Sequence, residues 1–340
     1  MSLNVKKIFY VFNTLFSFVW AWIYVVIGAR GRGKTYGAKK WLLNGWLYHK
    51  HKFIILRDTE RECEVISQDN GVRFWGDVLG EKKYSNLKIT MTKESVFING
   101  VLAGYVMPAS LFHLFKGSQY QDVKRVLYDE FIREKKQVRY NGNRALQFLN
   151  TLMTVARFRT DFKIVLTANA LDKGDVLLSD VFGFKLNGFG IYKNKAKGIV
   201  LDYAPNSEEF EQYQRSGNVY KLVQGTRFEG NLIGNQFAED DSGMFFDRKK
   251  PSTLFGIYYD KEGTAVRIYE SRDGDIFYAT SDINPNSVNY MRYTFDLRVA
   301  NHKIKLADNQ EKKKLQLLFS NNLIKFESSY ILGVFKDIIK

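Results

Sequence analysis

Short apolar runs alternate with longer amphipathic stretches over the first half of the chain. Four of these runs have the length and composition of buried strands: residues 24–27, 53–56, 125–129 and 163–167. Helical patterns lie between some of them, at about residues 35–48 and 146–153. Strands that alternate with helices are typical of a parallel sheet, so the sequence predicts an α/β fold.

Two further patterns interrupt this alternation. The dipeptide Asn99-Gly100 separates two apolar runs and predicts a β-hairpin inserted before the parallel order resumes. Beyond residue 230, three short strands joined by glycine-containing turns predict an antiparallel meander, which a helical tail follows at residues 312–340. We therefore expect a first domain over residues 1–200, a helical linker over 201–229 and a smaller α+β domain over 230–340.

The N-terminal segment is strongly apolar. Residues 8–27 contain only Asn13, Thr14 and Ser17 as polar breaks, a length that suits a transmembrane helix or a signal peptide. The last four or five of these residues must form the first strand, and the remaining residues, 8–20, are too few to span a bilayer. We expect them to form a helix packed on the domain.

The segment after the first predicted strand fits the pattern G-x-x-x-x-G-K-[ST] without a mismatch. Its residues that would bind a nucleotide are Gly28, Arg30, Gly31, Gly33, Lys34 and Thr35. Glycines let backbone N–H groups turn towards a β-phosphate, and the lysine reaches the β- and γ-phosphate oxygens. The threonine hydroxyl ligates Mg²⁺. The sequence therefore predicts a P-loop that uses ATP and Mg²⁺.

An acidic pair favours hydrolysis over binding alone. Asp129 and Glu130 end an apolar strand, where Asp129 would hold Mg²⁺ through water and Glu130 could polarise the attacking water. The next predicted strand leads to Asn169, a candidate sensor of the γ-phosphate in P-loop ATPases of the additional-strand type. The alternative for Asn169, a residue that only ends a strand and starts a loop, stays open.

The charge balance indicates a polyanionic partner. The chain has 51 Lys and Arg against 36 Asp and Glu, a net charge of +15, which favours nucleic acid or an anionic membrane surface. Basic residues gather just beyond the acidic pair, at residues 131–163, where they could couple ATP use to a phosphate backbone. The single cysteine, Cys63, excludes an internal disulfide and fits a reducing cytoplasm.

The P-loop and the string Asp-Glu-Phe-Ile-Arg-Glu-Lys at residues 129–135 together resemble one family, the DNA-packaging motor ATPases of phi-29-like podoviruses. The hairpin arm at residues 102–108 and the Arg157-Phe158-Arg159 string support the resemblance. These motifs span about residues 24–170, half of the chain. The C-terminal half is similar in size and strand order rather than in any motif.

The resemblance implies a ring-forming, terminase-like ATPase that pumps double-stranded DNA into a procapsid. Lys34 and Thr35 would bind ATP and Mg²⁺, Asp129 would ligate the metal, and Glu130 would be the catalytic glutamate. Arg157 would be the arginine finger that enters the neighbouring subunit's site. Arg159 and Lys116 are alternatives that the sequence does not separate from it.

The resemblance also implies partners and a location. Expected partners are double-stranded DNA, the portal or connector of the procapsid, and copies of the chain in a homo-oligomeric ring, a pentamer by resemblance. A structural packaging RNA is a further candidate partner. We expect the protein in the host cytoplasm, transiently docked on the procapsid and absent from the mature virion.

In the family, the second domain resembles a ribonuclease-H-like nuclease. An active nuclease of this kind needs several carboxylates converging on two metals, the first of them on a central strand. The first strand of the meander, residues 254–259, contains no acid, and the nearby acids lie in turns. We therefore expect a vestigial nuclease-like domain without nuclease activity.

Two other functions stay open. The apolar N-terminus motivates a membrane-anchored phage assembly ATPase. The basic charge also fits a nucleotide-gated nucleic-acid-binding module with negligible turnover. Glu130 argues against this module, since a protein that does not hydrolyse ATP could lose that acid freely.

Overall fold

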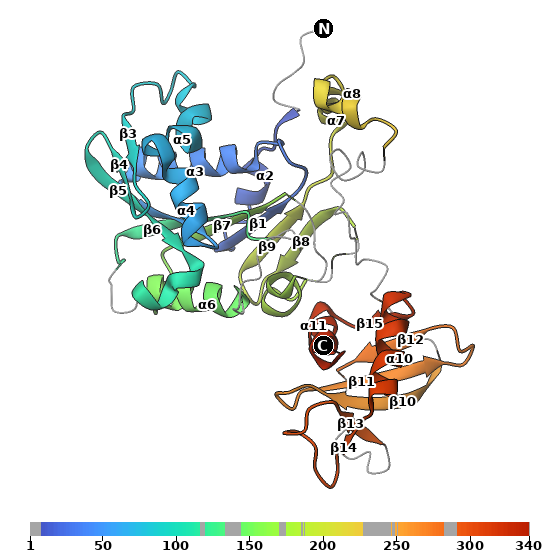
Figure 1. Cartoon of the computed structure of the whole chain (residues 1–340). Helices are drawn as coiled ribbons and strands as arrows, with labels where there is room; N and C mark the ends of the chain where they lie inside the picture. Colours follow the sequence, from blue (N-terminus) through green and yellow to red (C-terminus); the bar gives the residue numbers. More distant parts are fainter. Residues whose placement is uncertain are drawn as a thin grey trace. The chain divides into compact units, whose positions relative to one another are not determined.

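The structure is a computed structural model that describes residues 8–115, 120–132, 144–169, 175–184, 186, 188–226, 246, 249, 251–281 and 291–339. The chain divides into two compact units (Figure 1), residues 1–171 with 186–238 and residues 172–185 with 239–340. This division differs from the expected boundary at residue 200. Strands at residues 190–203 complete the sheet of the first unit, whereas residues 175–184 group with the second.

The described part of the first unit is built on a nine-stranded sheet of order β3-β4-β5-β2-β6-β7-β1-β9-β8. Its strands are β1 (Ile23–Ile27), β2 (Lys52–Arg57), β3 (Ile89–Met91), β4 (Ser95–Ile98), β5 (Val101–Pro108), β6 (Val123–Asp129), β7 (Lys163–Ala168), β8 (Gly190–Asn194) and β9 (Ile199–Tyr203). The strands from β5 to β9 in this order run parallel, and β3, β4 and β8 pair antiparallel at the two edges. The four predicted strands and the hairpin at Asn99-Gly100 are confirmed.

Strand β7 lies between β1 and β6 in the sheet. Ile27 at the end of β1 pairs with Ala168 of β7, and Thr167 of β7 pairs with Asp129 at the end of β6. The carboxyl ends of these parallel strands therefore meet at one edge, which brings the P-loop, the acidic pair and Asn169 together. This is the additional-strand arrangement that the sequence predicted.

Helices cover both faces of the sheet (Figure 1). Helices α3 (Lys34–His49), α4 (Glu60–Ser67) and α5 (Val72–Leu79) lie on one face, and α6 (Arg144–Val155) lies on the other. Short helical turns, η1 (Gln68–Gly71) and η2 (Ala109–Phe115), connect elements. Successive side chains of β6 point to opposite faces of the sheet. Leu127 is buried in the core that contains α3 residues, whereas the Tyr128 ring stacks on Phe148 of α6 with 5.4 Å between the ring centroids.

The N-terminal segment packs on the first unit, but the helix expected over residues 8–20 is wrong. The described segment contains α2 (Asn13–Phe16), a helix of four residues. Before it the backbone is held by the P-loop, because the Tyr10 N–H donates to the Arg32 carbonyl at 2.7 Å. Phe12 and Leu15 are buried in the core. Among the described helices, none is long and apolar enough to cross a membrane.

Two short helices follow β9 in the first unit, α7 (Glu208–Arg215) and α8 (Asn218–Val223), within the predicted helical linker. Ser207 caps α7 by accepting a hydrogen bond from the Phe210 N–H. The Phe210 side chain is buried in a small cluster with Ile8 and Ala29. Helix α7 therefore packs directly against the P-loop.

The second unit contains a sheet of order β14-β13-β10-β11-β12-β15 within its described residues. Its elements are β10 (Ser252–Tyr259), β11 (Ala265–Ser271), β12 (Phe277–Thr280), β13 (Arg292–Thr294), β14 (Lys305–Leu306), β15 (Ile324–Phe326), α10 (Asn309–Ser320), α11 (Ser329–Ile339) and the turn η3 (Leu177–Val181). The meander β10–β11–β12 is antiparallel, as predicted. The predicted helical tail is interrupted by β15, which pairs with β12.

Candidate active site

The P-loop connects β1 to α3, and glycine shapes it at two positions. Gly31 has φ of 80° and Gly33 has φ of 81°, in the left-handed region that favours glycine. Gly28 follows the fully buried β1, and a Cβ there would lie 3.4 Å from the Ala204 carbonyl oxygen. The Arg30 side chain is exposed. The loop therefore has the backbone freedom that a phosphate-binding turn requires.

Lys34 begins α3 and points into this loop. Its side chain is buried, and Nζ donates to the carbonyl oxygens of Gly28 at 2.9 Å and Ala29 at 2.6 Å and to Asn169 Oδ1 at 3.1 Å. An ammonium group has three donors, so these bonds use all of them. Burial lowers the pKa of Lys34 to about 8, against the opposing effect of Asp129. Lys34 therefore remains mostly protonated at neutral pH.

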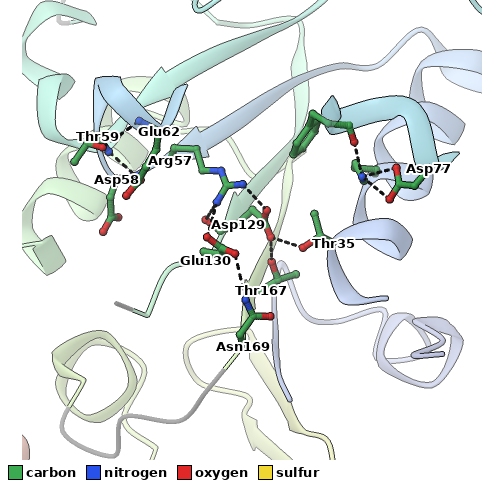
Figure 2. Close-up of polar contacts among 12 residues, drawn as sticks. Thr35, Arg57, Asp58, Thr59, Glu62, Asp77, Asp129, Glu130, Thr167 and Asn169 are labelled. Carbon is green, nitrogen blue, oxygen red and sulfur yellow. Dashed lines mark hydrogen bonds and ion pairs between the residues drawn. The ribbon is translucent and has the colours of Figure 1, made fainter. Parts of the chain in front are cut away.

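Asp129 lies at the centre of the polar network in Figure 2. Its side chain is 2% exposed, and Oδ1 accepts hydrogen bonds from the Thr35 hydroxyl at 2.7 Å and from the Thr167 hydroxyl. Hydroxyl and carboxylate oxygens are the ligands that Mg²⁺ prefers. The donor set formed by Thr35 and Asp129 therefore fits the predicted metal site.

Arg57, at the end of β2, holds both acids (Figure 2). Its Nη2 lies 3.0 Å from Asp129 Oδ2, and its Nη1 lies 3.1 Å from Glu130 Oε2. Burial alone would lower the pKa of Arg57, but the charges of Asp129 and Glu130 outweigh it and the pKa is raised. Sequence reasoning missed Arg57 and Thr167. A signal for Arg57 existed, since a charged residue ends an otherwise apolar strand there.

Glu130 and Asn169 extend the network towards the P-loop. The Glu130 side chain is 56% exposed and its backbone has φ of 57°, a conformation that non-glycine residues seldom adopt outside functional or tightly constrained sites. Asn169 donates from Nδ2 to Glu130 Oε1 at 3.2 Å and accepts from Lys34 through Oδ1. Asn169 thus bridges the P-loop lysine and the predicted catalytic glutamate. Its contacts therefore go beyond those of a residue that only ends a strand and starts a loop.

The structure distinguishes two of the three candidates for the arginine finger. Arg159 is held within its own chain, because it donates to the carbonyls of Tyr120 at 2.7 Å and Val123 at 2.5 Å and pairs with Asp161 at 2.9 Å. Arg157 follows α6 and is exposed, with φ of 51°. Lys116 lies outside the described residues. Arg157 is therefore better placed than Arg159 to reach another molecule.

A cleft of about 960 Å³ opens beside the P-loop. Gly31, Gly33, Lys34, Thr35 and Asn169 line it at the P-loop. The remainder is lined by aromatic residues of the N-terminal segment and of α3 together with polar and charged residues, among them Lys40, Asn44, Asp77 and Glu81. This volume lies at the upper end of the range for small-molecule sites. The cleft can therefore accommodate a nucleotide whose phosphates lie on the loop.

Comparison with known proteins identifies the family of the chain. The family model described as Podovirus DNA encapsidation protein (Gp16) matches residues 4–340. The chain belongs to this family. The match extends through both units, so the family covers the C-terminal half as well as the P-loop half.

Individual relatives match over similar lengths. This podovirus encapsidation family member is 25% identical over 327 residues to the DNA packaging protein of Bacillus phage B103, which covers 93% of this chain and 95% of that protein. It is 25% identical over 324 residues to the DNA packaging protein of Bacillus phage phi29, at 93% and 92% coverage. The predicted resemblance to phi-29-like packaging proteins is confirmed.

Solved structures confirm the fold. A chain of the bacteriophage phi-29 viral genome packaging motor assembly matches with a TM-score of 0.72 at 23% identity and covers 96% of this chain and 97% of that one. A chain of the Phi-28 gp11 DNA packaging motor matches with a TM-score of 0.66 at 19% identity, with 98% of each chain covered. The predicted α/β fold with a smaller second α+β part is therefore confirmed.

Proposed function

We propose that this chain is the ATP-hydrolysing subunit of a motor that moves double-stranded viral DNA into a procapsid. Membership of the encapsidation family supports the packaging role. The observation that carries the ATPase assignment is the network in which Asn169 joins Lys34 to Glu130, while Thr35 bonds to Asp129. These five residues meet at the edge of the sheet where the P-loop ends.

Each residue of the network has a chemical task in this proposal. Lys34 supplies positive charge to the phosphates of ATP and must exchange at least one present bond to do so. Glu130 orients the attacking water and accepts its proton. Because Asn169 bonds to both side chains, a phosphate that draws Lys34 away also changes what holds Glu130. Asn169 would thereby sense the γ-phosphate.

We propose that Thr35 and Asp129 hold Mg²⁺, because their oxygens lie 2.7 Å apart beside the P-loop. When bound, Mg²⁺ neutralises part of the charge on the phosphates. Arg57 orients the Asp129 carboxylate through the contact of its Nη2 with Oδ2 at 3.0 Å. Its own ion pairs with Asp129 and Glu130 set the spacing of the two acids.

We also propose a ring in which Arg157 acts on the neighbouring subunit's ATP. The exposed position of Arg157 and the internal bonds of Arg159 support this choice. Double-stranded DNA, the portal and further copies of the chain remain the proposed partners, with a structural packaging RNA as a candidate. The host cytoplasm, at the procapsid, remains the proposed location.

The second unit is proposed to lack nuclease activity. Two acids near its sheet are already paired, Glu311 with the Tyr258 hydroxyl at 2.5 Å and Asp296 with Arg298 at 2.5 Å. The described residues include no group of three or more His, Cys, Asp or Glu that could hold a metal ion. Incubation of supercoiled plasmid with the protein and Mg²⁺ or Mn²⁺ should leave it uncut, and nicking above buffer level would contradict this.

Steady-state ATPase activity, with and without double-stranded DNA and empty procapsids, tests the main proposal. DNA and procapsids should stimulate turnover. Glu130→Gln should bind ATP but leave it intact, because the amide cannot accept a proton, and Lys34→Ala should bind it weakly. Glu94→Gln, an exposed glutamate outside the network, is the matched control and should behave as wild type.

Each rival function predicts a different result. A nucleotide-gated binding module would show no turnover under any of these conditions. A membrane-anchored assembly ATPase would stay in the membrane pellet of expressing cells after a carbonate wash. Near-wild-type turnover by Glu130→Gln would remove the catalytic assignment.

A further inference from the structure

A second pocket, with a volume of about 500 Å³, lies at the amino ends of the parallel strands, opposite the P-loop. We call it the tryptophan pocket, after Trp20, Trp22 and Trp41, which line it together with Lys124, Arg125 and Lys163. Its residues come mainly from the segment before β1 (residues 16–22), from the amino ends of β1, β6 and β7, and from α3. Because these strands are parallel and five to seven residues long, the pocket lies about 20 Å from the P-loop edge.

Tryptophan rings give this pocket flat apolar walls. Trp22 is fixed, because its indole N–H donates to the Lys197 carbonyl at 2.9 Å and its ring packs edge-on against Phe162 at 5.4 Å. A Cβ on Gly198 would lie 2.4 Å from the Trp22 ring, so the β8–β9 turn fits closely against it. Trp20 is 37% exposed and borders the opening. Such rings are suited to stacking against a flat ligand.

The charges around the pocket are unbalanced. Lys124 pairs with Asp161, which also accepts an ion pair from Arg159. Arg125 lies 4.8 Å from the Trp41 ring centroid and donates to the Trp41 carbonyl, and Lys163 donates to the Tyr24 hydroxyl at 3.0 Å. Among the described residues, neither Arg125 nor Lys163 pairs with a carboxylate.

Arg125 is the most desolvated of the cations that line this pocket. Burial without a counter-charge lowers its pKa to about 10. The neighbouring His51 has a lowered pKa for the same reasons, burial first and then the charge of Arg125. An anion at this position would relieve both effects, because it would restore a partner to a desolvated cation.

We propose that the tryptophan pocket binds a nucleotide unit, with its base stacked against the tryptophan rings and its phosphate on Arg125 and Lys163. A bare phosphate would not use the rings, and an uncharged apolar ligand would leave the cations unmatched. Stacking platforms beside basic residues are a common means of binding single-stranded nucleic acid. Lys193 and Lys195 of the adjoining β8–β9 hairpin extend the basic surface for a continuing strand.

This site differs from the one proposed for ATP, since no residue of the P-loop lines it. The ligand chemistry has two sources, a free nucleotide or an unpaired nucleotide within a nucleic acid. Phe16 and Trp41, whose rings lie 5.8 Å apart, border both this pocket and the cleft beside the P-loop. A ligand here would therefore touch side chains that also line the candidate ATP cleft.

The test is a binding assay on the full chain, with excess ADP present to fill the P-loop. The probes are a short labelled oligothymidylate, a duplex of the same length and thymidine monophosphate. Wild type should bind the oligothymidylate. Trp20→Ala should weaken that binding about tenfold, while Trp20→Phe retains a stacking ring and most of the affinity. Lys163→Gln should lower the slope of log affinity against log salt by about 0.7, the loss of one phosphate contact.

Lys82→Gln, an exposed lysine outside the pocket, is the charge-matched control and should leave that slope unchanged. Competition by thymidine monophosphate would identify a free nucleotide as the ligand, and its failure to compete would identify nucleic acid. The proposal is overturned if wild type does not bind the oligothymidylate. The proposal is also overturned if Trp20→Ala and Lys163→Gln have wild-type melting temperatures and bind the oligothymidylate as wild type does. The same holds if these variants lose as much affinity for the duplex as for the oligothymidylate. None of these readouts depends on ATP turnover.

Discussion

Arg57 offers a quantitative test of how the acidic pair is held. Its guanidinium contacts Asp129 at 3.0 Å and Glu130 at 3.1 Å, and only 10% of the Arg57 side chain and 2% of the Asp129 side chain are exposed. Replacing Arg57 with Met removes the charge but keeps most of the volume. Asp129 then keeps only the hydroxyls of Thr35 and Thr167 as side-chain partners among the described residues.

Breaking a buried ion pair on one side costs about 3–5 kcal/mol, since it leaves a desolvated charge behind. For a folding unit of this size, 1 kcal/mol corresponds to about 2–4 °C in melting temperature, so Arg57→Met should melt roughly 10 °C below wild type. The double variant Arg57→Met with Asp129→Asn leaves no buried charge unpaired at this position, because the Glu130 side chain is 56% exposed, and should recover most of that loss. Thermal unfolding monitored by tryptophan fluorescence measures the melting temperatures of both variants.

Arg61→Met is the matched control. Arg61 forms an ion pair of similar length, 3.1 Å to Glu64, but its side chain is 78% exposed. Exposed pairs contribute about 0–1 kcal/mol, so its melting temperature should stay within a few degrees of wild type. The reasoning fails if Arg57→Met melts no lower than Arg61→Met, or if the double variant is as unstable as Arg57→Met alone.

Three further predictions concern the P-loop and the two arginines. Because the pKa of Lys34 is lowered to about 8, its ammonium group loses its charge as the pH rises through that value. The affinity for a non-hydrolysable ATP analogue, measured by equilibrium binding, should therefore fall between about pH 7.5 and 9.5. An affinity that does not change over this range would contradict the prediction. Gly31→Ala and Gly33→Ala both place a side chain in the left-handed region and should each cost about 1–2 kcal/mol in thermal unfolding; unchanged melting temperatures would contradict the loop geometry. Arg159→Ala should lower the melting temperature because it removes three interactions within the chain. Arg157→Ala should melt normally yet hydrolyse ATP on the order of 10³-fold more slowly. A mixture of Arg157→Ala and Lys34→Ala on procapsids should regain DNA-stimulated ATPase activity, and no recovery in rings containing both variants would place the arginine finger elsewhere.

The parts of the site that sequence predicted are those encoded within single short segments. The P-loop needs glycine at Gly31 and Gly33 for local backbone reasons, and the acidic pair directly follows an apolar strand, so both are visible without knowledge of the fold. Arg57 and Thr167 are less visible in this way, although a charged residue at the end of an apolar run marks Arg57. Their contacts with Asp129 depend on which strands flank β6 and in what register, which the sequence of one strand does not state.

The errors in the fold have related causes. Strand β8 exposes every second residue and includes lysine and asparagine, so it lacks the apolar run that predicts a buried strand. Strand β9 pairs with β1, which is distant in sequence, and β8 joins the sheet only through β9. At the N-terminus, the apolar length predicted a helix, but the hydrogen bond from Tyr10 to Arg32 holds the chain against the P-loop. In both cases partners elsewhere in the chain override the local pattern.

The division of the chain has a mechanical consequence. The backbone passes from one unit to the other three times, after residues 171, 185 and 238. Tension applied to the second unit would be divided among the three chain segments that cross between the units. A protease that cuts the chain once between the units would therefore leave them covalently joined.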